Sequence, residues 1–554
     1  MVTTAHGFIG THLSPFTDLL PSKSATFGPS LLAELANLMR GKPDSVKDGD
    51  DPEENLWVPA GYTYFGQFVD HDLTFDSTSS LNPADRAPQG THVPSNLRTP
   101  RFDLDNVYGD GPDAQPFMYE ADGATLLTGT NDLVRAPNHR AIIGDKRNDE
   151  NSIICQIQLG MIRYHNKIVA ALNAEDPAHW NAPHDVFNSA RNEVRWTYQR
   201  ILVDDFLPRI IQAKVLADLK DRTPHQRRKH YALYTAEKRA NLPREFVGAA
   251  YRFGHSGVRT GYRLNTTTSL SIFPGTIDPD HPILPTDSLL GFEPLPTGHV
   301  IEDWGRFFPA SSPGADIGTT GRKIAGNTPN TAVRLQYAYK IDTTIVDPLA
   351  ALPDSVAGAG TKAEAKVAIA PDSLPETKPD TRPQTRVSLA LLNLLRGDAY
   401  GLPSGQSVAR ALKDDGKKVT VLTPAQMVVR VATDAVPAGG NPDKAQAFQW
   451  TPVPVDLQHR TPLWFYVLAE AQLSVLNAVP GDQDGVFLES ELMAGAGAIT
   501  QLGWVGGRIV AEVFYGLLDA DPDSVFNHPA AHGFRPRLAA GGGGLLCMRN
   551  LLDF

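Results

Sequence analysis

This sequence contains very little cysteine, no long apolar run and no excess of positive charge. Only Cys155 and Cys547 are present among 554 residues, which excludes a disulfide framework. No apolar run approaches the length of a membrane span, and the N-terminus has no basic stretch followed by the apolar segment of a secretory signal. These absences favour a reducing, intracellular compartment, with export without a cleaved leader as the alternative.

The charge balance is acidic. Asp and Glu number 62 against 51 Lys and Arg, so the net charge is −11 and the pI is about 5.8. A broad nucleic-acid-binding surface is therefore not expected.

Strand-like alternation is also scarce, and helical periodicity dominates. The fold class we predict is mainly α, as one large helical domain over 55–520 with little β-structure. An N-terminal extension (1–54), a C-terminal tail (521–554) and two insertions rich in loop-forming residues, at about 345–386 and 434–455, complete the organisation. The expected helices cover 30–41, 63–75, 151–173, 185–220, 245–256, 387–396, 460–478 and 504–518.

One histidine lies in the apolar stretch "YFGQFVDHDLTFD", residues 64–76. On a helix, Gln67, Asp70 and His71 project from one wedge of the surface, whereas Asp72 points elsewhere and must have another partner. The alternative is a core histidine held by a carboxylate, with Asp72 at the surface.

A second polar cluster lies in "RTPRFDLDNVYG". Thr99, Asp103 and Asp105 fall on odd positions, and the carbonyl of Arg101 could join them around a hard cation such as calcium. The loop does not follow the EF-hand pattern, and an Asp-rich turn without a metal is the alternative.

The segment "GDKRNDENSIICQIQ" places Arg147 and Glu150 three residues apart at the start of a long apolar helix, which Asp145 or Asn148 could cap. An ion pair within the first turn is the simplest interpretation of this spacing.

A fourth segment, "EFVGAAYRFGH", sets small residues before Arg252 and His255. Such small side chains let a broad object approach the helix closely. A flat cofactor and a neighbouring helix would both fit.

Together these segments resemble the haem peroxidases of the animal peroxidase–cyclooxygenase superfamily. "GQFVDHDLTF" is similar to that family's distal-histidine helix, "TPRFDLDNVYG" to its calcium loop and "GDKRNDEN" to its distal-arginine segment. "AAYRFGH" resembles its proximal-histidine helix, and "LNLLRGDAYGLP" the asparagine-bearing helix behind it. The motifs occur in the family's order, and the lack of disulfides fits a bacterial-type member better than a vertebrate one.

The resemblance implies a role for each matching residue. His71 would be the distal histidine, which takes a proton from hydrogen peroxide and returns it to the departing oxygen. Arg147 would stabilise the developing negative charge, and Gln67 would hold water or a halide over the iron. His255 would be the proximal iron ligand, with Asn393 accepting a hydrogen bond from its other ring nitrogen.

Other residues would hold the haem itself. Arg252 would pair with a propionate, and Arg396 lies on the same helix as Asn393. The resemblance implies ester bonds from Asp70 and Glu150 to the methyl groups of haem b. Asn151 stands where some relatives have a methionine, so a third, sulfonium link is not expected. The calcium ligands would be Asp72, Thr99, Arg101 (through its carbonyl), Asp103 and Asp105.

The implied function is a peroxidase that reduces hydrogen peroxide through an oxoferryl intermediate and oxidises halides, thiocyanate or small phenolic donors. One alternative is a fatty-acid dioxygenase of the same superfamily, which uses a tyrosine three residues before the proximal histidine. Arg252 occupies that position here, and Tyr251 is one residue away. Another alternative is a non-catalytic haem-binding or adhesive protein.

Overall fold

The computed structural model of the chain describes most of its length. The described residues are 14–20, 25–42, 51–75, 95–96, 98–175, 183–235, 241–273, 288–315, 335–352, 366–369, 384–434, 447–493, 499–537 and 546–553.

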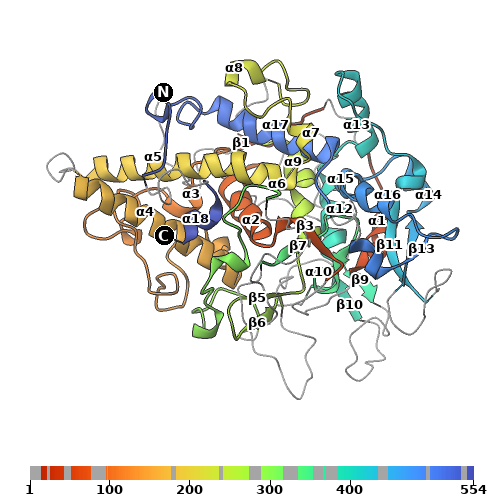
Figure 1. The fold of residues 1–554 in the computed structure, drawn as a ribbon, viewed down its shortest axis with the longest axis horizontal. Coiled ribbons are helices and arrows are strands. Elements are labelled where there is room, and N and C mark those ends of the chain that lie inside the picture. The colour runs from red at the N-terminus through yellow and green to blue at the C-terminus, as the bar shows by residue number, and fades with distance from the viewer. Residues whose placement is uncertain are drawn as a thin grey trace.

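Helices are the predominant regular structure of the described chain, and the predicted mainly-α fold class is confirmed (Figure 1). The longest, α4 and α5, pack against each other along one end of the molecule. The helices are α1 (Pro29–Leu38), α2 (Gly61–Leu73), α3 (Asp105–Tyr108), α4 (Ser152–Glu175), α5 (Pro183–Ile201), α6 (Leu207–Ile210), α7 (Ala213–Leu216), α8 (Pro224–Arg227), α9 (Arg244–Gly248), α10 (Asp347–Ala350), α12 (Leu389–Ala399), α13 (Gly405–Asp414), α14 (Val455–Gln458), α15 (Leu463–Ala471), α16 (Leu473–Ala478), α17 (Trp504–Ala520) and α18 (Met548–Leu552).

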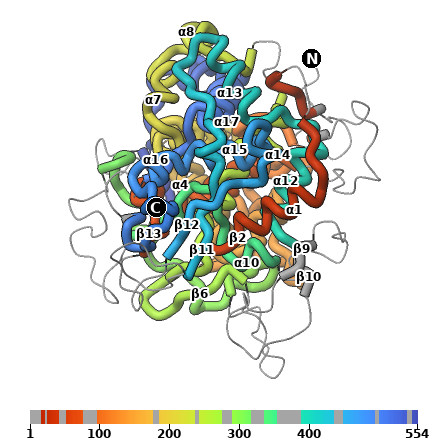
Figure 2. The backbone as a smooth tube through the Cα atoms, turned by 90° about the vertical axis from the view of Figure 1, so that its right-hand side faces the viewer, coloured from red at the N-terminus to blue at the C-terminus, as the bar shows by residue number. Residues whose placement is uncertain are grey.

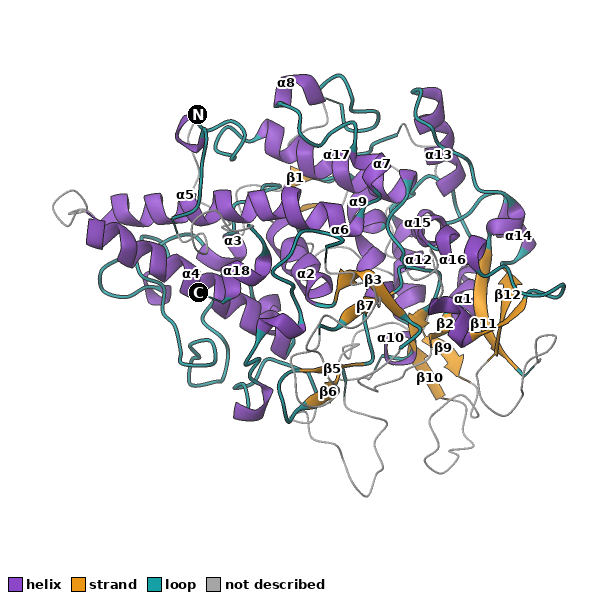
Figure 3. Ribbon diagram, in the orientation of Figure 1, coloured by secondary structure: helices purple, strands orange, loops and turns teal. Residues whose placement is uncertain are grey.

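The strands form small separate sheets of two or three members. In Figure 3 β1 lies among the helices, whereas the other labelled strands lie in the centre and in the lower and right-hand parts of the molecule. Among the described strands, only the pair β2–β8 is parallel. The sheets are β1 (Ser14–Pro15) with β4 (Ser95–Asn96), β2 (Arg40–Lys42) with β8 (Ile345–Val346), β3 (Glu54–Pro59) with β7 (Tyr337–Tyr339), β5 (Gly261–Arg263) with β6 (Ser269–Ser271), β9 (Lys366–Ile369) with β10 (Gln384–Val387), and β11 (Val428–Thr433) with β12 (Ala447–Pro452) and β13 (Val486–Leu488).

The two segments predicted as insertions contain ordered elements where they are described. The first includes β8, α10 and β9, and the second includes β12. Strand β12 brings Phe448 and Trp450 into a small apolar core of its own, separate from the main one. The β11–β13 sheet lies at the side of the molecule that faces the viewer in Figure 2. The boundaries predicted at 54 and 520 stay predictions.

Helix α2 lies inside the main core. Phe65, Phe68 and Val69 are fully buried, and the rings of Phe65 and Phe68 pack edge-to-face on Tyr198 of α5. Helix α2 also contacts α4 and the segment that carries His255. The predicted helix over 63–75 is therefore confirmed, with a start two residues earlier.

Two predicted helices are interrupted. The expected helix over 185–220 contains a π-helical turn, η4 (Leu202–Phe206), between α5 and α6. The expected helix over 245–256 breaks at Ala249, whose φ of −142° and ψ of −71° are not helical, and continues as the 3₁₀ helix η5 (Ala250–Gly257). Residues three apart lie directly above one another on a 3₁₀ helix, so Arg252 and His255 share one face.

Candidate functional site

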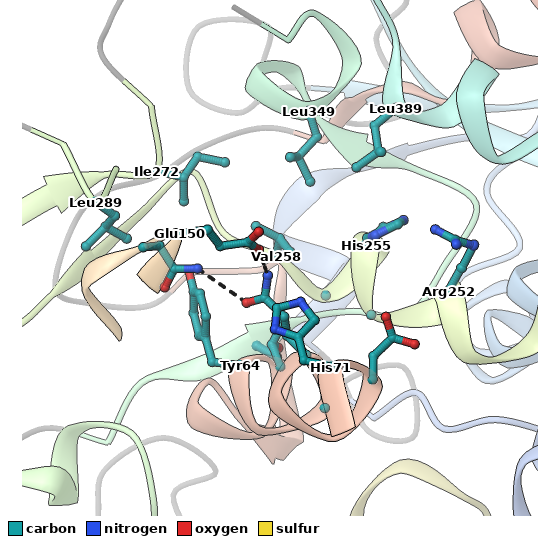
Figure 4. A pocket seen from close by; sticks show the side chains of 18 of the residues that line it. Tyr64, His71, Glu150, Arg252, His255, Val258, Ile272, Leu289, Leu349 and Leu389 are labelled. Atoms are coloured by element: carbon teal, nitrogen blue, oxygen red, sulfur yellow. Dashed lines mark hydrogen bonds between the residues drawn. The ribbon is translucent and has the colours of Figure 1, made fainter. Parts of the chain in front are cut away.

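A cavity of about 880 Å³ separates α2 from η5 (Figure 4). Its size is within the range of pockets that enclose a ligand or cofactor. Polar side chains come from α2, from the start of α4 and from η5, while aliphatic side chains close the rest. The polar lining includes Gln67, Asp70, His71, Asn138, Arg140, Glu150, Asn151, Arg252 and His255, and the apolar lining includes Val58, Val258, Ile272, Leu289, Leu349 and Leu389.

His71 reaches the cavity from the buried side of α2 and is only 5% exposed. Its Nδ1 lies 2.8 Å from Oδ1 of Asn148, whose Nδ2 donates to Oε1 of Gln158 at 2.8 Å. Because that amide oxygen can only accept, His71 carries its proton on Nδ1 and keeps the lone pair on Nε2. Burial, helped by the charge of Arg147, lowers the pKa of His71 to about 4, so the ring is neutral at physiological pH.

Next to His71, three side chains form a hydrogen-bonded row across the cavity (Figure 4). Nε2 of Gln67 donates to Oε1 of Glu150, and Nδ2 of Asn151 donates to Oε1 of Gln67 at 3.3 Å. Burial raises the pKa of Glu150 to about 7, so this carboxyl exchanges its proton near neutrality. Asp70 lines the same cavity one residue before His71.

Arg147 is not among the described residues that line the cavity. Its Nη2 donates to Oδ2 of Asp145 at 2.7 Å and to the carbonyl oxygens of His71, at 3.1 Å, and Thr74. The guanidinium also stacks on Phe75, 4.9 Å from the ring centroid. These contacts hold the C-terminal end of α2, and they bring Arg147 against the backbone of His71 rather than into the cavity.

His255 borders the cavity from η5. Its Nδ1 lies 2.8 Å from the side-chain amide of Asn393, which is buried in α12. An asparagine amide can present its oxygen after a half-turn, so this contact can accept the proton of a ring bonded through Nε2. Burial, together with the charges of Arg252 and Arg396, lowers the pKa of His255 to about 3. The imidazole is therefore neutral, as a metal ligand must be.

The flanking residues of η5 also have defined positions. Arg252 lines the cavity, and its Nε donates to the carbonyl of Val247 at 2.8 Å. Tyr251 lines it too, and its hydroxyl donates to the carbonyl of Gly66 at 3.2 Å. The guanidinium of Arg396 lies 6.0 Å from the ring centroid of Tyr400, and Arg396 is not among the described lining residues.

Asp72 points away from the cavity and is completely buried, so the alternative that it lies at the surface is wrong. Neither of its carboxylate oxygens has a hydrogen-bond partner. Burial and the charges of Asp103 and Asp105 raise its pKa well above the usual range. The hydroxyl of Thr99 donates to Asp103 at 2.9 Å and to Asp105 at 3.1 Å.

The loop around these carboxylates bends sharply. Leu104 adopts a left-handed φ of 64° between Asp103 and Asp105, a conformation that costs energy for a branched residue. Nη1 of Arg101 reaches Oδ1 of Asp521 at 3.5 Å. Within the described part of the chain, no three His, Cys, Asp or Glu side chains are arranged so that they could hold a metal ion. Unsatisfied buried oxygens are nevertheless what a hard cation would need.

The donor set also fits a haem. Two neutral imidazoles from separate elements, the buried His71 and the half-buried His255, border one cavity, each with its Nδ1 fixed by an asparagine. Sequence reasoning named both histidines and Asn393 but considered Asn148 only as a helix cap. Neither Asp145 nor Asn148 caps the long helix α4. Asp145 accepts from the backbone N–H of Arg147 in the short 3₁₀ turn Lys146–Asp149, and Oδ1 of Asn151 accepts from the backbone N–H groups of Ile153 and Ile154 at the start of α4. Asn148 instead turns inward to His71, which local spacing does not reveal.

The described helices include none that is both long and apolar enough to cross a membrane.

Comparison with known proteins gives a consistent result. Residues 83–277 match the family described as animal haem peroxidase. Chorion peroxidase of Drosophila melanogaster is 31% identical over 141 residues, which are 24% of this chain and 17% of that protein. Heme peroxidase 2 of Caenorhabditis elegans is 24% identical over 314 residues, 53% of this chain and 41% of that protein. The chain therefore spans less than half the length of these curated relatives.

Among solved structures, peroxidase A from Dictyostelium discoideum is similar in fold. The TM-score is 0.53 at 14% sequence identity, and the match covers 95% of this chain and 90% of that one.

Proposed function

Because the chain belongs to the animal haem peroxidase superfamily, within the wider peroxidase–cyclooxygenase group, we propose that it is a haem-dependent peroxidase. It would reduce hydrogen peroxide and oxidise a halide, thiocyanate or a small phenolic donor. The observation that carries this proposal is the pair of neutral histidines on one cavity, His71 buried and His255 half-buried, each held through Nδ1 by an asparagine.

His255 would bind the haem iron through Nε2, and Asn393 would fix the ring by accepting the Nδ1 proton. Arg252, on the same face of η5, would pair with a propionate, and Arg396 would add positive charge behind the ligand. A haem bound here would supply the redox chemistry between hydrogen peroxide and the electron donor.

Residues of α2 would carry out the proton transfer. His71, neutral and with its Nε2 lone pair unused by protein, would take the proton from one peroxide oxygen and deliver it to the other. Gln67 would orient water, peroxide or a halide beside it. The contacts of Arg147 support a positioning role, because its guanidinium holds the carbonyls of His71 and Thr74 at the end of α2.

Asp70 and Glu150 would form two ester bonds to the haem under the action of peroxide. Both carboxyl groups border the cavity. The pKa of Glu150 is near 7, so this group can become uncharged at physiological pH, and an ester is likewise uncharged. With Asn151 in place of a methionine, no third bond can form. Mass spectrometry of peroxide-treated protein should find haem on two peptides. Asp70→Val should abolish one attachment and Glu150→Gln the other, and complete extraction of haem from the treated wild type would refute the esters.

Calcium would bind on the far side of α2. Asp72 would join Thr99, Asp103, Asp105 and the carbonyl of Arg101, which is consistent with the two unsatisfied oxygens of Asp72. The cation would remove the mutual repulsion of three buried carboxylates and tie the loop to the back of the histidine helix.

Steady-state kinetics test the function as a whole. Haem-loaded protein should consume peroxide when bromide, iodide, thiocyanate or a phenol is supplied, and the preferred donor identifies the substrate class. Oxygen uptake with a fatty acid, in place of peroxide turnover, would assign the dioxygenase alternative. Haem binding without either reaction would assign the non-catalytic one.

A further inference from the structure

Three tyrosines line the cavity, and their hydroxyl groups have different partners. Tyr251 donates to a main-chain carbonyl, and Tyr64 packs edge-to-face on Tyr262 and interacts with its hydroxyl. Tyr62 donates a hydrogen bond to Oδ2 of Asp205. Among the described partners of these tyrosines, only Asp205 is a base that can take up a phenolic proton.

An irregular helical turn of the backbone positions Asp205 for its hydrogen bond with Tyr62. It lies in the π-helical turn η4 between α5 and α6, and such turns are frequent at functional sites. The residue is 2% exposed and Arg209 is 0% exposed, with Nε of Arg209 donating to Oδ1 at 2.9 Å. The backbone N–H of Met548 donates to Oδ2 at 3.3 Å. A buried ion pair of this kind is a weak contributor to stability, so stability alone does not explain it.

We propose that Tyr62 is a redox-active residue that stores one oxidising equivalent taken from the haem, with Asp205 as its proton acceptor. The inference rests on the proposed function, because the oxidant is the peroxide-oxidised haem. One electron passes from Tyr62 to that haem, and the phenolic proton passes to Oδ2 of Asp205. Tyr62 becomes a neutral phenoxyl radical, Asp205 becomes a carboxylic acid, and the haem is reduced by one electron.

The surroundings favour this coupled transfer over loss of the electron alone. A phenol cation radical would be a new positive charge in a buried site, where the guanidinium of Arg209 already lies 4.7 Å from the ring centroid. Moving the proton along the existing hydrogen bond avoids that charge and needs no rearrangement. Burial raises the pKa of Asp205, which also favours the acid form after transfer.

The ring of Tyr62 is fixed by its packing. It meets Phe308 edge-to-face at 5.0 Å and stacks on Phe206 at 6.4 Å between centroids. The radical would therefore form at one site in one geometry, which a spectroscopic measurement can resolve.

Freeze-quench EPR of the haem-loaded protein, mixed with hydrogen peroxide without a donor, tests the inference. The wild type should give a tyrosyl signal that narrows when tyrosine is ring-deuterated. Tyr62→Phe should reduce the signal at least tenfold, and the matched controls Tyr64→Phe and Tyr251→Phe should leave it within twofold. Haem absorption recorded on the same samples reports whether the haem has been oxidised.

The outcomes separate the two proposals. A haem that is oxidised normally in a wild type without a tyrosyl signal, or a signal that persists in Tyr62→Phe, overturns the inference and leaves the peroxidase function standing. A haem that does not react with peroxide overturns both. Asp205→Asn should lose the radical although its phenol is intact, and Asp205→Glu should restore part of it. A full tyrosyl signal in a folded Asp205→Asn protein would show that Asp205 is not the proton acceptor.

Discussion

The two walls of the cavity each hold a histidine through an asparagine, yet the histidines have different neighbours. The distal wall, made by Gln67, Asp70 and His71 of α2 with Glu150, presents carboxyl and amide groups. The proximal wall is η5, where Arg252 accompanies His255. Loss of solvation in the protein lowers the pKa of both rings and keeps them neutral. The neighbours would therefore distinguish the proposed tasks of the two histidines, since Asp70 and Glu150, whose carboxyl groups can accept and release protons, lie on the distal wall.

Removal of the distal imidazole should give the largest effect. His71→Ala should retain haem but react with peroxide about 10²–10⁴-fold more slowly, because no other described distal group combines a free lone pair with a neutral ring. Stopped-flow absorption measures the rate. His139→Ala, an exposed histidine near the cavity mouth that contacts Glu293, is the control and should react normally. Wild-type reaction rates in both variants would show that the distal histidine does not transfer the proton.

The pH dependence of the free energy of unfolding tests the carboxyl group of the distal wall. In haem-free protein, the pKa of Glu150 rises from 4.5 in the unfolded chain to about 7. The folded state then binds this proton more tightly, so the contribution of Glu150 to stability is greatest below pH 4.5 and falls by about 3 kcal/mol as pH rises to 7. Urea unfolding at pH 4.5 and at pH 7 should show that the change in stability between the two pH values differs between the wild type and Glu150→Gln by about this amount. Glu293→Gln, at an exposed glutamate of the cavity mouth, should behave like the wild type.

The two asparagines should differ in what they control. Asn393→Ala should weaken haem binding about 10–100-fold, as expected for loss of the group that orients a metal ligand. Asn148→Ala should leave haem affinity unchanged and slow the peroxide reaction, because His71 loses its fixed tautomer. Haem titration and stopped-flow on both variants give a crossed comparison, and equal effects on both quantities would mean that the two walls are not functionally distinct.

Calcium removal should act on the distal wall alone and give the smallest effect. Metal analysis should find one calcium per chain, and chelation should slow the peroxide reaction several-fold while leaving haem bound. Asp72→Asn should lose the metal and show the same defect. A calcium-free wild type with full activity would contradict the proposed site.

Much of the distal wall could be predicted from the sequence, because helical periodicity alone puts Gln67, Asp70 and His71 on one wedge and Asp72 on another. The direction of the Arg147 side chain could not be predicted. Its guanidinium donates hydrogen bonds to Asp145 and to carbonyl oxygens at the end of α2, and spacing within one segment does not reveal that α2 lies beside it.

The backbone of the proximal wall could likewise be predicted only in part from the sequence. The pattern over 245–256 predicts one helix, whereas the chain changes at Ala249 to a 3₁₀ helix. Gly248 packs so closely that an added Cβ would lie 2.8 Å from the ring of Tyr400. The need for close approach explains the small residues, but it depends on contacts with a distant segment. The π-helical turn that carries Asp205 likewise has no signature in the periodicity of α5.

Haem titration of the wild type, His71→Ala and His255→Ala, with the ligand field read by absorption and EPR, tests most directly whether one wall binds the iron and the other does the proton work. The wild type and His71→Ala should each bind one haem per chain with the same histidine-ligated ferric spectrum. His255→Ala should bind haem at least tenfold more weakly and lose that spectrum. An unchanged spectrum and affinity in His255→Ala, or loss of the histidine signature in His71→Ala, would contradict this assignment of the two walls.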